Sequence, residues 1–210
     1  MRNSYFHDGK SQDLSGVLGW SKNFLSNYKS TVSPIPGNLV RPNQCATLWR
    51  PPDPSVFKIN CMAITDAKAC KIGIGIVIRD HKGSVLASCC QCQNAKYNRV
   101  TANAMAILKG LHLGNACCGE SPVCIESNVA AVVKWINDAS HLDSDCGVIL
   151  NDIAAILNHM GISSVLTGPT GTNKVALGLA KKALVLENNF VWMNDFPPCV
   201  SREIEAEKNC

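Results

Sequence analysis

The carboxylates are the side chains of this sequence that could hold a divalent metal or exchange protons in a hydrolytic reaction. Glu126 ends a short expected strand and lies on the same face of it as Asn128, two residues further on. Asp66 and Asp80 are expected in turns, and Asp152 is expected on the exposed side of a helix. No two of these carboxylates have a spacing typical of a shared metal site.

The cysteines are a second group with possible chemistry, and there are 12 of them in 210 residues. Cys89 and Cys92 have the C-x-x-C spacing of a zinc knuckle, but no second knuckle or C-x-x-H partner follows at zinc-finger distance. The N-terminus lacks the apolar core of a signal peptide, and no run of apolar residues is long enough to span a membrane. We therefore expect an intracellular protein, cytoplasmic or nuclear and not secreted, whose cysteines are reduced and mostly serve as small apolar residues.

A glycine- and threonine-rich segment, 168–174, ends in Lys174 and looks like a phosphate loop, but it lacks the G-x-x-x-x-G-K-[ST] spacing. It could still bind an anion through the N-terminus of the helix that follows. His112, His141 and His159 stand in no pattern that pairs them with a nucleophile. We expect structural or surface roles for these three histidines.

The elements that must position these residues follow from apolar periodicity, which predicts three hairpin strands and then alternating helices and strands. Strands are expected over 56–64, 71–79, 84–93, 122–126 and 162–166. Helices are expected over 101–117, 129–136, 148–157 and 172–186. With the consecutive helices 129–136 and 148–157 taken as one helical unit, this βββαβαβα order predicts an α/β fold with a mixed five-stranded sheet and helices on its faces.

Three glycines have expected roles in this arrangement. Gly73 and Gly75 share one face of their strand, where larger side chains would obstruct a close neighbour. Gly83 ends the turn 80–83 and is able to adopt a positive φ there.

Five motifs occur in a fixed order along the chain. They are Lys58-Ile59-Asn60-Cys61-Met62-Ala63, the stretch from Gly73 to Gly83, Ala102-Asn103-Ala104-Met105-Ala106, Glu126-Ser127-Asn128, and the stretch from Asn173 to Ala180. This series resembles the plant-type RNase H-like domain (RNase H type-1) of retrotransposon-derived, reverse-transcriptase-associated proteins. That family reads K-x-N-x-D-G, G-x-G-x-V-x-R-D-x-x-G, A-E-A-x-A, E-S-D and N-x-x-A-[DH]-x-L-A. The resemblance implies an RNase H-like fold and an RNA–DNA hybrid ribonuclease that uses Mg²⁺.

The metal-binding carboxylates of the family fall here on Met62, Asn103, Asn128 and Leu177. A thioether, two neutral amides and an alkyl group are poor ligands for Mg²⁺. The resemblance therefore implies no catalytic residue and no metal ligand in this chain, with Glu126 as the best surviving candidate. No cofactor is expected, and Mg²⁺ would be needed only if activity survives.

Three functions remain open at this point. The first is a catalytically inactive RNase H-like protein of nucleic-acid-binding ancestry, a pseudoenzyme. The second is an active RNA–DNA hybrid endoribonuclease, as the family implies. The third is a non-functional remnant of a mobile element.

The chain is expected to divide into a partly disordered leader or linker (1–48), an RNase H-like domain (49–198) and a C-terminal tail (199–210). Residues 1–50 hold six Lys and Arg against two Asp and Glu, whereas the rest of the chain is balanced. Within the domain, Lys71, Arg99 and Lys109 could form a local basic face, with Lys96 beside them. We expect at most weak, salt-sensitive binding of nucleic acid, no membrane association and no small-molecule cofactor.

Overall fold

The computed structural model describes residues 48–138, 146–162, 164–186 and 188–208. The predicted leader therefore lies outside the described residues except for Leu48, and so does the connection that contains His141. None of the helices in the four described ranges combines the length and the hydropathy that crossing a membrane requires.

A six-stranded mixed sheet forms the centre of the molecule. Its strands are β1 (Phe57–Asp66), β2 (Lys71–Arg79), β3 (Val85–Asn94), β4 (Val123–Ser127), β5 (Val165–Thr167) and β6 (Phe190–Met193), in the spatial order β5-β4-β1-β2-β3-β6. Strands β1, β2 and β3 pair antiparallel, and β4 and β5 run parallel to β1. The predicted α/β fold with a mixed sheet is confirmed. The sheet has one strand more than predicted, because β6 pairs with the outer edge of β3.

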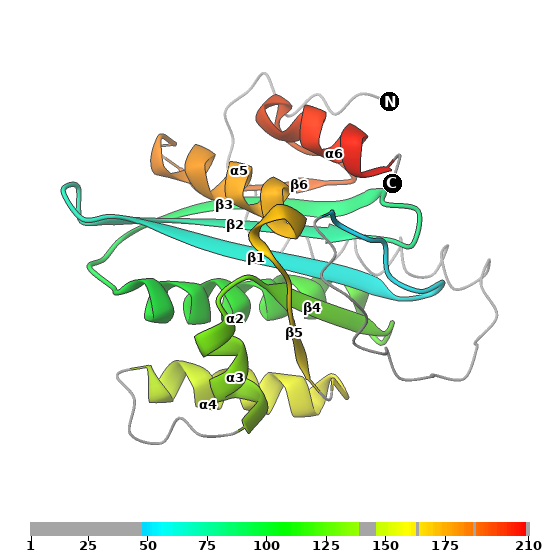
Figure 1. Cartoon of the computed structure of the whole chain (residues 1–210), viewed down its shortest axis with the longest axis horizontal. Coiled ribbons are helices and arrows are strands. Elements are labelled where there is room, and N and C mark those ends of the chain that lie inside the picture. The colour runs from blue at the N-terminus through cyan, green and yellow to red at the C-terminus, as the bar shows by residue number, and fades with distance from the viewer. Residues whose placement is uncertain (1–47, 139–145, 163, 187, 209–210) are drawn as a thin grey trace.

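Helices cover both faces of this sheet (Figure 1). Helix α5 (Lys174–Leu184) and helix α6 (Ser201–Lys208) lie over one face, and α2 (Arg99–Cys118) lies under the other with α3 (Ala130–Asp138) and α4 (Gly147–His159). Two short 3-10 turns, η2 (Thr170–Asn173) and η3 (Pro198–Val200), precede α5 and α6. Helix α6 occupies the stretch expected as a tail, and its Ile204 is buried in a core cluster with Val175, Leu179 and Ala183 of α5.

Helix α5 packs against β2 through the two glycines singled out above. A Cβ atom on Gly75 would lie 2.1 Å from the carbonyl oxygen of Ala176, and one on Gly73 would lie 2.2 Å from that of Ala180. Both obstacles are backbone atoms of α5, so the helix as a whole would have to move. The expectation that bulk at these positions would obstruct a close neighbour is confirmed.

Replacing Gly75 with alanine is expected to lower the free energy of unfolding by about 2 kcal/mol, because overpacking a tight core contact costs in this range. Urea denaturation of both proteins would measure the loss. Gly161→Ala is a useful comparison, since no atom lies within 4 Å of its added Cβ, although its positive φ adds some backbone strain. A Gly75→Ala variant as stable as the natural chain would show that α5 does not pack this closely on β2.

The cysteines of the described residues behave mainly as core residues. Cys61, Cys89, Cys90, Cys117 and Cys118 are buried and free, and Cys146 is also buried. Burial raises the pKa of Cys89 and of Cys117 to about 12, so their thiols stay protonated. Cys89 is buried and Cys92 is half-buried, and their odd spacing places them on opposite faces of β3. Within the described part of the chain, no three His, Cys, Asp or Glu side chains are grouped as metal ligands.

Candidate functional site

Two of the four positions at which the family carries carboxylates, Met62 of β1 and Leu177 of α5, share one apolar cluster. Met62 lies in β1 opposite Gly75 of β2 and is 7% exposed. Its side chain belongs to an apolar cluster with Ala176 and Ala180, against which Leu177 packs. The site between β1 and α5 is therefore filled by apolar contacts.

The third position, Asn103, is fully engaged in hydrogen bonds between α2 and β1. Its Oδ1 accepts from the Ala63 N–H at 2.9 Å, and its Nδ2 donates to the carbonyl oxygens of Ala63 at 3.2 Å and of Arg99 at 2.9 Å. The last pair between β1 and β4 is Cys61–Ser127, so Ala63 lies beyond the end of β4. The Asn103 side-chain amide thus forms hydrogen bonds with the β1 backbone at Ala63, beyond the end of β4. A carboxylate could accept from Ala63 but could not donate.

The fourth position, Asn128, directly follows β4 and is half-buried. The pairing of Cys61 with Ser127 places Met62 and Asn128 side by side, one residue further along. The Asn128 Oδ1 is buried and has no hydrogen-bond partner among the described residues. The register thus brings Met62, Asn103, Asn128 and Leu177 together around one end of β1.

These four residues do not fit the Mg²⁺ that the family would bind there. Magnesium takes oxygen ligands, most of them carboxylates and waters. The Oδ1 of Asn103 already accepts from Ala63, and Met62 and Leu177 offer no oxygen side chain. That leaves only the neutral Oδ1 of Asn128, and one amide oxygen cannot offset the charge of a divalent ion.

Glu126, the best surviving candidate, is also engaged. It is 8% exposed, and its Oε1 accepts from Thr172 Oγ1 at 2.7 Å and from Asn60 Nδ2 at 3.3 Å. Its Oε2 lies 3.5 Å from Lys58 Nζ. The backbone of Gly168 approaches so closely that an added Cβ would lie 2.4 Å from Oε1. Glu126 therefore joins β4, β1 and the segment before α5, and it is closed off by these contacts.

Two of the other three candidate acids lie where the sequence predicted. The Asp66 carboxylate accepts from the N–H groups of Lys68 and Ala69 in the turn after β1. Asp80 accepts from two N–H groups in the next turn, where Gly83 has a φ of 75°. Asp152 is exposed on α4. Asp80 and Asp152 lie as predicted, whereas Asp66 is the last residue of β1 and its carboxylate accepts from the turn that follows. None of the three is among the hydrogen-bond partners of Asn103 or the members of the Met62 cluster.

The basic residues divide between two places. Lys71 begins β2 and pairs with Asn94, the last residue of β3, and the chain then runs through exposed Lys96 to Arg99 at the start of α2. Lys71, Lys96 and Arg99 therefore lie at one end of the molecule. Lys109 is half-buried and stands roughly 15 Å further along α2, at 1.5 Å per residue.

A buried polar network beside the site was not anticipated from the sequence. Arg79, at the end of β2, is 1% exposed; it pairs with Glu207 of α6 and donates to Asn60 Oδ1 at 3.0 Å. The Arg79 Cζ lies 3.6 Å from the ring centroid of Trp49, whose Nε1 donates to the same Asn60 oxygen. Asn60 in turn donates to Glu126. The network links the start of the domain, the sheet and the C-terminal helix.

Burial acts against the charges of this network. It raises the pKa of the Glu207 carboxyl, and the nearby Arg79 partly opposes that rise. It also lowers the pKa of Arg79, although a guanidinium stays charged at any physiological pH. Each charge therefore depends on its partner to remain in the interior.

Comparison with known proteins gives one family and a consistent set of folds. A family model described as "Reverse transcriptase-like" matches residues 60–183. A search of curated proteins finds no match.

Three solved structures illustrate the likeness in fold. RNase H1 from the halophilic archaeon Halobacterium salinarum NRC-1 is 16% identical with a TM-score of 0.51, and the match covers 61% of this chain and 97% of that one. LC11-RNase H1, isolated from compost and solved with an RNA/DNA hybrid, is 19% identical with a TM-score of 0.52, covering 61% and 99%. The foamy viral protease-reverse transcriptase with an RNA/DNA hybrid is 17% identical with a TM-score of 0.51, covering 73% and 22%. The chain belongs to the reverse transcriptase-like family and has its RNase H-like domain.

Proposed function

We propose that this protein is a catalytically inactive, retrotransposon-derived RNase H-like protein that retains weak binding of nucleic acid. One observation carries the loss of activity: the positions of the metal ligands are occupied by an apolar cluster of Met62, Ala176 and Ala180, against which Leu177 packs, and by the hydrogen-bonded amide of Asn103. Two-metal hydrolysis needs several anionic ligands acting together. Among the residues that the structure describes, no group of carboxylates replaces them, and Glu126 is held by Lys58, Asn60 and Thr172.

Binding is the part of the ancestral function that this structure supports. Two of the similar structures were solved with an RNA/DNA hybrid. In this chain, Lys71, Lys96 and Arg99 lie at one end, and Tyr97 between them is 40% exposed. Lysine and arginine contact phosphates, and an exposed aromatic ring offers a stacking surface for a base. The free cysteines fit a reducing compartment, so we place the protein inside the cell.

A labelled RNA–DNA hybrid tests both parts of this proposal. With Mg²⁺, we expect no cleavage above the background of a no-protein control. Without metal, we expect binding that weakens steeply with salt, and Lys71→Ala or Arg99→Ala should each reduce the slope of log K against log salt by about 0.9. Lys181→Ala, an exposed lysine on α5, serves as the matched control.

The two alternatives give other results in the same assay. An active endoribonuclease would cleave the hybrid, and EDTA would abolish the cleavage. A mobile-element remnant without function would fold but show no salt-dependent binding that responds to Lys71 or Arg99. Either result would replace the proposal.

A further inference from the structure

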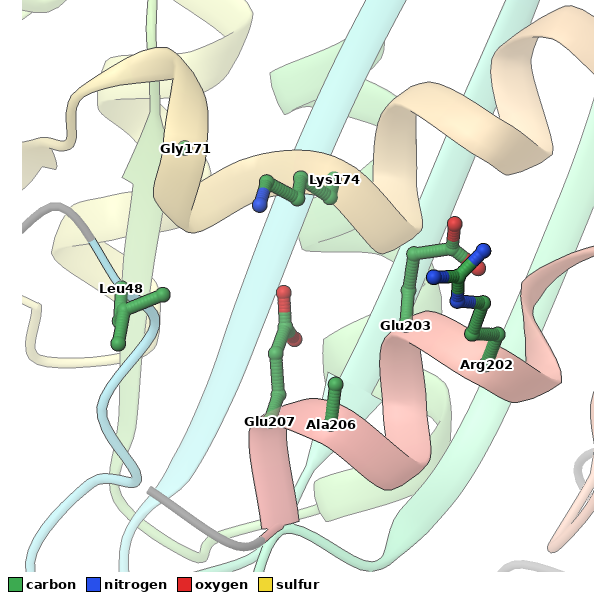
Figure 2. Close-up of a pocket in the computed structure, with 7 residues that line it drawn as sticks. All are labelled: Leu48, Gly171, Lys174, Arg202, Glu203, Ala206 and Glu207. Carbon is green, nitrogen blue, oxygen red and sulfur yellow. The ribbon is translucent and has the colours of Figure 1, made fainter.

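A cavity of about 350 Å³ lies between the start of α5 and helix α6, apart from the end of β1 described above. Gly171 and Lys174 line it from one side, and Arg202, Glu203, Ala206 and Glu207 line it from α6 (Figure 2). Leu48 contributes an apolar surface at its edge. Its volume lies at the lower end of the range for sites that bind small molecules, about 300–1,000 Å³.

The wall of this cavity contains a buried acceptor without a partner. Glu207 is 6% exposed, and its Oε2 is paired with Arg79. Its Oε1 is buried and has no hydrogen-bond partner among the described residues. Buried polar atoms are rarely left unpaired, so this oxygen suits a donor supplied by a ligand. Because Arg79 already balances the charge of Glu207, a neutral N–H group is sufficient.

Two cationic side chains also line the cavity, one from each wall. Lys174 is the first residue of α5 and Arg202 lies in the first turn of α6, and both side chains are exposed. The first turn of α5, which directly continues η2, contains no acidic residue that would offset the positive end of the helix dipole. Lys174 and Arg202 thus begin two helices that line the same cavity, with Glu203 beside Arg202, and lysine and arginine are the side chains that bind phosphate.

We propose that this cavity binds a nucleoside monophosphate, with the phosphate on Lys174 and Arg202 and an N–H group of the base on Glu207. Leu48 and Ala206 supply apolar surface for the ring, which a sugar phosphate would not use. The same chemistry occurs in a free nucleotide and at the 5′-phosphorylated end of an RNA strand. This nucleotide site is independent of the nucleic-acid binding proposed at Lys71 and Arg99. Most of its lining residues come from α6, which lies outside the residues 60–183 that the family model matches.

Isothermal titration calorimetry of the full chain with guanosine monophosphate tests this site. We expect saturable binding that Lys174→Ala and Arg202→Ala each weaken by about tenfold, the usual effect of losing one charge-assisted contact. Ala206→Trp should abolish binding by filling the cavity while leaving the Arg79–Glu207 pair in place. Lys181→Ala and Ala155→Trp, at exposed positions of α5 and α4, should bind as the natural chain does.

The ligand itself tests the role of Glu207 without altering a buried residue. Purine riboside monophosphate has no N–H group on its base, and we expect it to bind at least about tenfold more weakly than guanosine monophosphate. Competition by a 5′-phosphorylated RNA would identify a strand end as the source, and its failure to compete would identify the free nucleotide. Absence of saturable binding at millimolar nucleotide, or equal binding by Ala206→Trp, would overturn the proposal.

Discussion

Replacing Glu207 with alanine is expected to lower the free energy of unfolding by about 3–5 kcal/mol, the usual cost of removing one partner of a buried ion pair. The reason is that Arg79, 1% exposed, would keep its charge in the interior without a carboxylate. Its remaining side-chain partners would be Asn60 and the ring of Trp49. Urea denaturation followed by circular dichroism would measure the loss.

Two further variants give this experiment its controls. Glu205→Ala removes an exposed carboxylate from the same helix and should change stability by less than about 0.5 kcal/mol, as most surface substitutions do. The double change Arg79→Met with Glu207→Met should recover most of the loss, because apolar side chains replace both charges. A Glu207→Ala protein as stable as the natural chain would mean that α6 does not close over Arg79.

Replacing Asn103 with aspartate is expected to cost about 3 kcal/mol of unfolding free energy, since it buries a charge and leaves acceptors unpaired. The aspartate would be of nearly the same size but could not donate to the carbonyl oxygens of Ala63 and Arg99. The variant moves the residue toward the acidic character of the family and should nevertheless be less stable. Thermal and urea unfolding would both record this.

Asn115→Asp provides the matched comparison, because Asn115 is an exposed residue of the same helix. It should be nearly neutral, so the difference between the two variants isolates the contact with β1. Equal stability of Asn103→Asp and the natural chain would contradict the structural role of this amide and would reopen the position to metal binding.

Much of the fold follows from local patterns in the sequence. The alternating isoleucines of β2 and the apolar stripe of α5 are strong periodic signals. The glycines of β2 predict a closely packed neighbour, and the structure shows that this neighbour is α5. Strand β6 has only four residues, all half-buried, and shows no alternation that distinguishes it. Helix α6 is strongly polar, so its sequence resembles an exposed tail; its position depends on Arg79 and on Val200 and Ile204 in the core.

The candidate site was likewise predictable from the sequence only in part. The motif order identified which positions differ from the family, but not what replaced the metal. The packing of Met62 with Ala176 and Ala180 and the hydrogen bonds of Asn103 to Ala63 join segments that are far apart in the chain. The pairing of Glu207 with Arg79 spans 128 residues and has no local signal. Such partners are set by packing, and only the folded structure shows them.

Binding of Mn²⁺ is the most direct measurement of the central claim, that the family's metal site is filled by packing and hydrogen bonds. Manganese takes the same oxygen ligands as magnesium, and its electron paramagnetic resonance signal distinguishes free from bound ion. We predict no saturable binding at millimolar Mn²⁺, because Met62, Leu177 and Asn103 offer no free anionic ligand. One or two equivalents of tightly bound Mn²⁺, released by Glu126→Gln, would contradict this and show that Glu126 leaves its present partners to bind metal.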